Sequence, residues 1–115
     1  MTLISFDIDG TMSFGDPPGP LTVALVQRCR ALGYRIGSGS DRTERNQWEL
    51  WRAHGVELDF VSLKHRLSDL RARFQVTRCI HIGDTEMDEY FARQAGFEFW
   101  FADALPTEGA TGWIL

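Results

Sequence analysis

Lysine is almost absent from this chain: of its 12 basic residues, only Lys64 is a lysine, and the others are arginines. There are two cysteines, Cys29 and Cys79, and neither stands in a C-x-x-C or zinc spacing, which argues against a disulfide scaffold and favours a reducing cytoplasm. No apolar run approaches the roughly 20 residues that a membrane-spanning helix needs. No basic region precedes the first apolar run either, so the sequence predicts neither a membrane span nor a signal peptide.

An excess of positive charge is also missing. The chain carries 16 acidic against 12 basic residues, a net charge of -4, which gives no support to general binding of nucleic acid or of a membrane surface. What is present is an ordinary globular composition over 115 residues, with 43% hydrophobic and 24% charged residues. That length and composition predict one domain spanning residues 1–115, large enough to fold without disulfides.

Segments typical of strands and helices alternate along the chain. Short apolar runs predict strands at 3–8, 34–39, 58–63, 78–82 and 97–101. The helical spacing of apolar residues predicts helices at about 20–32, 41–54, 64–75 and 86–95. Gly19 and Pro20 suit the start of the first helix, and Asp41 with Glu44 forms a capping-box pattern at the start of the second. The segment 103–115 shows no clear pattern.

This alternation predicts an α/β fold, with a doubly wound and mostly parallel sheet and helices on both faces. In such sheets the functional site lies beyond the carboxyl ends of the strands. Polar or charged residues follow four of the five predicted strands at that end: Asp7, Asp9, Gly10 and Thr11 after the first; Ser40 and Asp41 after the second; Lys64 after the third; and Gly83, Asp84, Thr85 and Asp88 after the fourth. This convergence is the main functional signal of the sequence.

The string Asp7-Ile8-Asp9-Gly10-Thr11 has a direct chemical interpretation. Side chains two residues apart in an extended segment point the same way, so Asp7 and Asp9 can share one crevice. Two carboxylates at such a short separation repel each other unless a cation lies between them, and Mg²⁺ prefers such hard oxygen ligands. Gly10 allows a sharp turn whose nearby backbone N–H groups can hold an anion.

With these residues, the sequence resembles the haloacid dehalogenase-like (HAD) hydrolase superfamily. The D-x-D-G-T motif of that family matches residues 7–11, and its acidic G-D-x-x-x-D motif matches residues 83–88. The serine or threonine that ends the family's second strand matches Ser40, and the lysine near the end of the third strand matches Lys64. Ser38, followed by Gly39, is an alternative match for the second motif. The motifs occur in the family's order and span residues 3 to about 101.

The resemblance implies a Rossmann-like sheet of about five strands in the order 5-4-1-2-3, and a Mg²⁺-dependent phosphatase that acts on a phosphomonoester. Asp7 would be the nucleophile that forms an aspartyl-phosphate, and Asp9 would be the general acid and base. The phosphate would be bound by Gly10, Thr11, Ser40 and Lys64. The metal would be held by Asp7, Asp84, Asp88 and the backbone carbonyl of Asp9. Orienting Lys64 would be the alternative role of Asp88.

The resemblance also bears on the substrate. Many members have a cap domain that closes over the site, inserted after the first strand or between the third strand and the lysine. Here the first connection spans only residues 12–20 and the second is essentially absent, so the chain resembles the capless group. Capless members act on large substrates or take a lid from a neighbouring subunit, so a macromolecular phosphorylated substrate or a homo-oligomer is expected. A small sugar phosphate or nucleotide stays open, as does a nucleic-acid end, although the net charge does not support the latter.

A receiver-type, phospho-accepting signalling domain is the alternative from another class of proteins. It too is a small doubly wound sheet with acidic residues, a serine or threonine, and a lysine. In a receiver, however, the acceptor aspartate follows the third strand and the lysine follows the fifth. Here the third strand leads to Lys64, and the fifth ends near Phe101 without a lysine.

Two further features have structural interpretations. His81 lies within an apolar strand, which favours a place in the core over a catalytic role. A group of arginines follows the second strand and forms either a solvated helix face or a basic rim for a polyanionic substrate; it consists of Arg42, Arg45 and Arg52.

Overall fold

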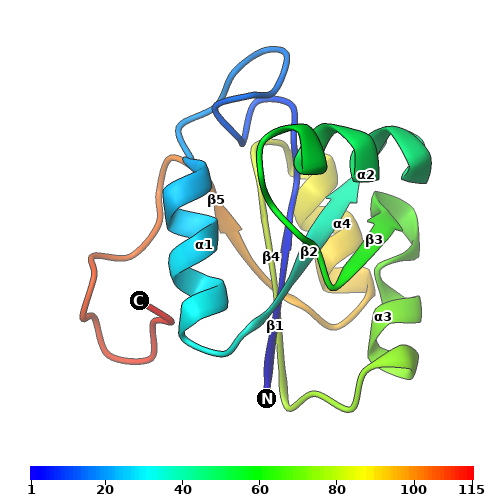
Figure 1. Cartoon of the computed structure of the whole chain (residues 1–115). Coiled ribbons are helices and arrows are strands. Elements are labelled where there is room, and N and C mark those ends of the chain that lie inside the picture. Colours follow the sequence, from blue (N-terminus) through cyan, green and yellow to red (C-terminus); the bar gives the residue numbers. More distant parts are fainter.

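The computed structural model describes residues 1–115 and contains five strands that alternate with helices along the chain (Figure 1). The strands are β1 (Thr2–Phe6), β2 (Arg35–Ser40), β3 (Phe60–Leu63), β4 (Arg78–Gly83) and β5 (Glu98–Phe101). The α-helices are α1 (Val23–Ala31), α2 (Glu44–Ala53), α3 (Ser68–Arg73) and α4 (Glu86–Gln94), and a 3₁₀ helix, η1, covers Lys64–Arg66. The predicted alternation is therefore confirmed. None of these helices combines the length and the apolar character needed to cross a membrane.

All neighbouring strands pair in parallel, in the order β3-β2-β1-β4-β5. This is the predicted order 5-4-1-2-3 counted from the opposite edge. The central strand β1 carries the fully buried Leu3, Ile4 and Phe6, as expected for a strand that is covered on both faces. Because the strands are parallel, their carboxyl ends share one edge of the sheet, the upper edge in Figure 1, where the connection after β1 also lies.

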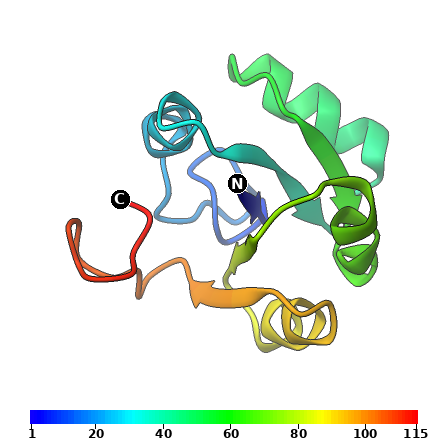
Figure 2. The ribbon, with the colours of Figure 1, turned by 90° about the horizontal axis from the view of Figure 1, so that it is seen from below.

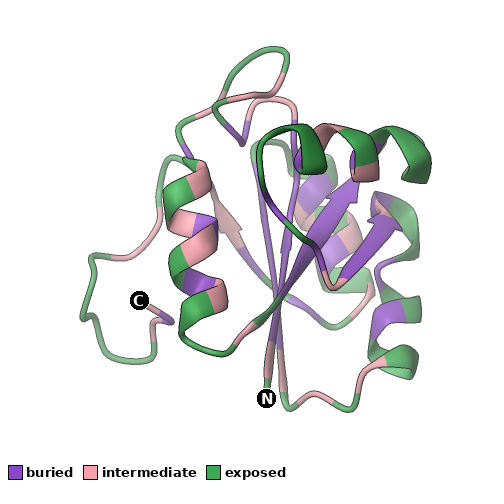
Figure 3. Cartoon of the chain, viewed as in Figure 1, coloured by how far each residue is buried: buried purple, intermediate pink, exposed green.

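Helices cover both faces of the sheet, with α1 and α2 on one face and α3 and α4 on the other (Figure 2). Alternate strand residues supply the two cores. Ile4 and Phe6 of β1 belong to the cluster that contains Trp51 of α2. Leu3 belongs to the cluster that contains Leu70 of α3. Figure 3 shows the buried strands between helices whose outer surfaces are exposed, the arrangement of a Rossmann-like α/β fold.

Two predicted helices have different bounds in the structure. Helix α1 begins after Thr22 rather than at Gly19 and Pro20, because the Thr22 hydroxyl accepts the backbone N–H of Leu25 at 3.3 Å. The helix predicted at 64–75 is divided into η1 and α3, which meet at Leu67 without a side-chain cap.

The start of α2 also differs from the predicted one. Thr43 is the N-cap, and its hydroxyl accepts the backbone N–H of Asn46 at 3.1 Å. The predicted capping box of Asp41 and Glu44 is therefore wrong. The carboxylate of Asp41 is left free for a contact elsewhere.

The C-terminal segment 103–115 packs beside α1. The Tyr34 hydroxyl donates to the carbonyl of Ile114 at 2.7 Å, and Ile114 itself is buried in the same core cluster as β1. The ring of Trp113 meets that of Trp100 edge to face, with 5.6 Å between centroids. These contacts make the segment part of the core on the α1 side of the sheet.

Candidate functional site

The strand ends bring most of the predicted site residues around one polar cavity of about 200 Å³. Its lining has no hydrophobic side chain and consists of Asp7, Asp9, Pro17, Ser40, Asp41, Lys64, Asp84 and Thr85. Three other predicted site residues do not line this cavity, namely Gly10, Thr11 and Asp88. The convergence expected from a parallel sheet thus leads to one small, acidic cavity at its carboxyl edge.

Asp7 directly follows β1 and is only 3% exposed. Its backbone N–H donates to the carbonyl of Ile82 at 2.9 Å, so β4 fixes its position. The hydroxyl of Thr11 donates to Asp7 Oδ2 at 3.3 Å, and Lys64 Nζ lies 3.6 Å from Oδ1. The backbone N–H of Thr11 is also engaged, with the carbonyl of Ile8. This arrangement leaves Thr11 no free donor for the phosphate contact that was predicted for it.

Burial and the nearby charge of Asp88 raise the pKa of Asp7 from 3.8 to about 8, although Lys64 acts in the opposite direction. A carboxyl group must be ionised to act as a nucleophile or as a metal ligand. Without a further positive charge, most Asp7 side chains are therefore protonated at neutral pH. A cation bound beside Asp7 would favour its ionised form.

Asp88, in the first turn of α4, is fully buried and meets five donor groups. Its Oδ2 accepts the backbone N–H groups of Asp84 and Thr85 at 3.3 and 3.2 Å, and the Thr85 hydroxyl at 2.8 Å. Its Oδ1 lies 3.0 Å from both His81 Nε2 and Lys64 Nζ. Because a carboxylate offers about four lone-pair positions, no position on Asp88 is left for direct contact with a metal ion.

The same carboxylate caps helix α4. The Thr85 hydroxyl accepts the backbone N–H of Asp88 at 3.2 Å, which completes a capping box with Thr85, not Asp84, as the N-cap. A Cβ atom on Gly83 would overlap the Asp88 carboxyl group, so glycine is needed there for close approach. Burial opposes the charge of Asp88, but the hydrogen bond from His81 and the charge of Lys64 hold the pKa of Asp88 well below its usual range.

Lys64 begins η1 directly after β3 and is 5% exposed. Its Nζ lies 3.0 Å from Asp88 Oδ1 and 3.6 Å from both Asp7 Oδ1 and Asp41 Oδ2. Burial disfavours the charged ammonium group, but the three carboxylates outweigh it and raise the pKa of Lys64. A compact ammonium group suits a position among three carboxylates better than a planar guanidinium does, which gives the single lysine of the chain a physical reason.

One carboxylate oxygen from each of Asp7, Asp84 and Asp88 lies within 4.8 Å of the other two, a spacing that suits a metal ion. Asp84 is exposed, whereas the other two are buried. Gly10, with a φ of +74°, has no side chain at the place that the Asp84 carboxylate occupies. Since the oxygens of Asp88 are already engaged, Asp7 and Asp84 are the residues with oxygens free for direct contact.

Mg²⁺ is expected to stabilise the folded protein through Asp84. At about ten times its Kd, a ligand that binds only the folded state adds roughly 1.4 kcal/mol, which raises the Tm of a small domain by about 5 °C. We expect Asp84→Asn to lose most of that rise, because one of the two available carboxylates is gone. Thermal unfolding in EDTA and at increasing Mg²⁺ concentrations measures this rise in Tm. Asp69→Asn, on the exposed side of α3, is the matched control; an equal rise in both variants would contradict the assignment of Asp84.

The side chain of Asp9 contacts Arg42 rather than the acidic cluster. Arg42 donates to both Asp9 oxygens, from Nε at 3.0 Å and from Nη2 at 2.8 Å, and the backbone N–H of Asp16 donates to Oδ1 at 2.9 Å. The hydrogen bonds from Arg42 are the main reason that the pKa of Asp9 is lowered. The predicted metal contact of Asp9 can therefore involve only its backbone carbonyl. Arg42 reaches the site, whereas Arg45 pairs with Glu49 on the outer face of α2.

Ser40, not Ser38, lies at the cavity. The Ser40 hydroxyl oxygen accepts the backbone N–H of Arg42 at 3.1 Å, which leaves its hydrogen free to donate. The Ser38 hydroxyl instead donates to Gln47 Oε1 at 2.5 Å, on the side of the sheet that α2 covers. The geometry thus favours Ser40 as the residue available to a ligand.

Gln47 is a supporting residue that the sequence analysis missed. It is fully buried in α2 and donates to the backbone carbonyls of Arg42 and Ser62 at 2.8 and 3.1 Å. It therefore ties the end of β2 to β3. The available signal was its place four residues before Trp51, on the buried face of the helix.

His81 is buried in β4, as predicted, but it also contacts the site. Its Nδ1 lies 2.9 Å from Ser5 Oγ, and its Nε2 lies 3.0 Å from Asp88 Oδ1. Ser5 and His81 are paired neighbours in β1 and β4. A buried polar chain thus runs from Ser5 through His81 and Asp88 to Lys64. A polar side chain in the interior of each of two apolar strands, Ser5 in β1 and His81 in β4, was the only signal for it in the sequence.

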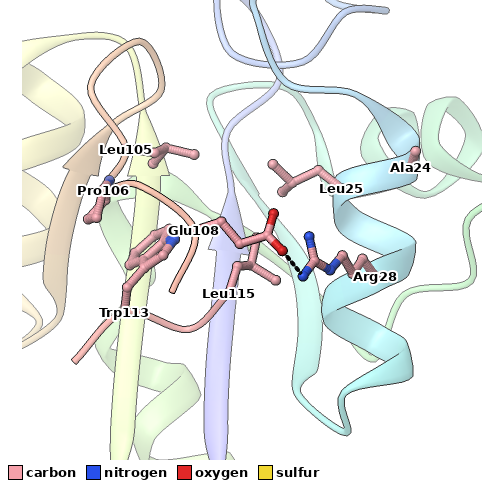
Figure 4. Close-up of a pocket in the computed structure, with 8 residues that line it drawn as sticks. All are labelled: Ala24, Leu25, Arg28, Leu105, Pro106, Glu108, Trp113 and Leu115. Atoms are coloured by element: carbon pink, nitrogen blue, oxygen red, sulfur yellow. Dashed lines mark hydrogen bonds and ion pairs between the residues drawn. The ribbon is translucent and has the colours of Figure 1, made fainter. Parts of the chain in front are cut away.

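A separate cavity of about 450 Å³ lies between α1 and the C-terminal segment (Figure 4). Its lining is mostly apolar and includes Leu25, Leu105 and Trp113. The ion pair of Arg28 with Glu108 borders it. None of the predicted site residues lines this cavity, so the chemistry of the acidic site does not involve it.

No protein-family model matches the chain, and no curated protein matches it. The function is therefore inferred from the residues of the site.

Proposed function

We propose that the chain is a Mg²⁺-dependent phosphatase with the chemistry of the HAD superfamily, which hydrolyses a phosphomonoester through an aspartyl-phosphate on Asp7. The observation that carries this proposal is the position of Asp7, buried at the end of β1 with Lys64 3.6 Å away and Asp84 in the same acidic cluster. A cavity of about 200 Å³ has room for a phosphoryl group, while a larger leaving group must project out of it.

The charges around the cavity suit phosphate only when a cation is bound. Two cationic side chains, Lys64 and Arg42, face four carboxylates, those of Asp9, Asp41, Asp84 and Asp88, and the acid group of Asp7. This excess of negative charge repels a phosphate dianion. Asp7 and Asp84 would hold Mg²⁺, which would supply positive charge that favours the ionised form of Asp7 and attracts phosphoryl oxygens.

In the proposed reaction, an oxygen of Asp7 attacks phosphorus, and the bond from phosphorus to the leaving-group oxygen breaks. Asp9 gives a proton to that oxygen. Water then attacks the phosphorus of the aspartyl-phosphate, Asp9 takes the water proton, and inorganic phosphate leaves with Asp7 restored. The ammonium group of Lys64 and the free hydroxyl hydrogen of Ser40 stabilise the charge on the phosphoryl oxygens.

The contact between Asp9 and Arg42 has to change during this reaction. Both Asp9 oxygens accept hydrogen bonds in the free protein, and Asp9 is ionised there. It can take a proton from water in that form, but it has none to give to a leaving group. The acid step thus requires that Arg42 loosen its contact once a substrate is bound and that Asp9 then take up one proton, from solvent or from the monoanion of the substrate phosphate. The proton that Asp9 later takes from water returns to solvent when the free protein is restored.

The proposed substrate is set by the open cavity. The connection between β1 and α1 is short, and β3 ends at Leu63, directly before Lys64, so neither place carries an inserted cap. An open site favours a large phosphorylated molecule whose bulk stays outside the cavity, or a small one enclosed by a neighbouring subunit.

Phosphate release tests the proposal. A panel of sugar phosphates, nucleotides, and 3′- and 5′-phosphorylated oligonucleotides is incubated with the protein in Mg²⁺ and in EDTA. We expect release in Mg²⁺ only, and acid-quenched protein that carries one phosphoryl group on the peptide containing Asp7. A lasting phosphoryl group without release favours the receiver-type alternative and contradicts the phosphatase, as does the absence of both release and phosphorylated protein across the panel.

A further inference from the structure

This inference rests on the proposed function, which places Arg42 beside the leaving group. Asp9 passes its proton to the leaving-group oxygen, so that oxygen lies next to Asp9. Arg42 is bonded to both oxygens of the same carboxylate. In the proposed reaction the transferred phosphoryl group binds at Asp7 and Lys64, whose side chains are far more buried than that of Asp9. Groups attached to the leaving oxygen therefore pass close to the guanidinium of Arg42.

Arg42 also has hydrogen-bonding capacity to spare. A guanidinium group carries five N–H donors. Three are engaged, two with Asp9 and one with Asn46 Oδ1 at 2.8 Å. The side chain is 29% exposed, so the remaining donors are accessible from solvent. Lys64 is only 6% exposed and already faces three carboxylates. Arg42 is therefore the cation of the site that an additional anionic group can reach.

We propose that Arg42 binds a second phosphate, carried by the leaving group, so that the chain prefers phosphomonoesters whose leaving group is itself phosphorylated. A guanidinium group fits phosphate oxygens with two parallel hydrogen bonds. When Arg42 donates hydrogen bonds to this second phosphate, its hydrogen bonds to Asp9 break. The Asp9 oxygens are then free to face the leaving oxygen. One residue then couples recognition of the leaving group to the step in which Asp9 acts.

Matched substrates test the preference. Glucose 6-phosphate is compared with glucose 1,6-bisphosphate, and a nucleoside 3′-phosphate with a 3′-phosphorylated dinucleotide. In the wild type, we expect kcat/KM to be about 10- to 100-fold higher for the second member of at least one pair, in line with charge-assisted hydrogen bonds. The pair that shows the preference identifies the source of the second phosphate as a small molecule or a polynucleotide.

The variants assign the preference to Arg42. Arg42→Ala is expected to bring the ratio within each pair to about 1, because the receptor for the second phosphate is lost. Arg45→Ala, in the first turn of α2 and paired with Glu49, is expected to keep the wild-type ratio. If Arg42→Ala lowers kcat/KM equally for both members of a pair, Arg42 only orients Asp9 and the inference is overturned, as it is if the wild type shows no preference.

A binding measurement separates this inference from the proposed reaction. Calorimetry on Asp7→Asn, which cannot form the aspartyl-phosphate, compares the affinities for glucose 1,6-bisphosphate, glucose 6-phosphate and the two nucleotide probes without turnover. The inference is supported if the doubly phosphorylated member of a pair binds more tightly and this difference disappears in Arg42→Ala. A lack of phosphate release from every probe would then contradict only the phosphatase. Release of phosphate without any effect of Arg42→Ala on either ratio contradicts only the inference.

Discussion

Asp7→Asn is expected to abolish phosphate release and, at the same time, to stabilise the metal-free protein. The loss of turnover should be at least about 1,000-fold, because an amide cannot form the aspartyl-phosphate. The gain in stability has a different cause. Asp7 is buried near Asp88, and its pKa is raised from 3.8 to about 8, so its ionised form is unfavourable in the folded protein. A neutral amide of the same shape removes that cost.

The sign of the pH dependence follows from the proton balance. The folded protein holds the Asp7 proton up to about pH 8, whereas the unfolded chain releases it near 3.8, so the free energy of unfolding decreases as pH rises between these values. The upper limit of that decrease is about 6 kcal/mol. Local relaxation reduces it, and we expect about 3 kcal/mol, a Tm difference of roughly 10 °C between variant and wild type at pH 8 to 9.

Thermal unfolding in EDTA from about pH 4.5 to 9 measures this difference. The gap between Asp7→Asn and the wild type should be small at the acidic end and should widen toward pH 8. Mg²⁺ should narrow it, since the ion stabilises only the protein that retains Asp7. Asp69→Asn, which removes an exposed carboxylate, should follow the wild type at every pH. A Tm difference that stays constant with pH would contradict the prediction, because the stabilisation by Asn would then not come from removing the charge of Asp7.

The residues directly after strands could be predicted from the sequence, because topology alone brings them together. Asp7, Lys64 and Asp84 each follow a strand by one residue, and parallel strands end at one edge. Asp9 shows the limit of this reasoning. Asp7 and Asp9 line the same cavity, as expected, but β1 ends at Phe6 and the backbone then turns, with the N–H of Thr11 bonded to the carbonyl of Ile8. The alternation rule does not extend past the strand, so the contact with Arg42 could not be predicted.

The helix caps show a second limit. Asp41 stands near Thr43, and Asp84 stands beside Thr85, and either residue type caps a helix well. In both cases the threonine is the cap, while the aspartate faces the site, Asp41 toward Lys64 and Asp84 in the acidic cluster. Local propensity ranks the two types nearly equally. The contacts of the two aspartates at the site involve residues distant in the sequence, which a local pattern does not contain.

Asp88→Ala is expected to destabilise the protein by about 4 kcal/mol, because removal of one partner leaves buried charged and polar groups unpaired. Lys64 would lose its closest carboxylate, and His81 would lose its only contact on Nε2. The capping box at Thr85 would also be broken. The pH dependence is opposite to that of Asp7. The pKa of Asp88 is lowered, so its contribution is present above its ordinary value of 3.8 and is lost as pH falls further.

Urea unfolding at neutral pH measures the loss, and three variants locate its origin. Glu89→Ala, on the same helix in an exposed pair with Arg93, should cost less than about 1 kcal/mol. Asp88→Asn keeps the shape and one acceptor oxygen, so it should recover part of the loss. In Lys64→Met the cost of Asp88→Ala should fall by about 2 kcal/mol, because the unpaired buried charge is no longer there. Coupling of that size shows that Asp88 acts by holding Lys64 toward Asp7. If the two losses simply add, Asp88 stabilises the fold independently of Lys64, and its orienting role is contradicted.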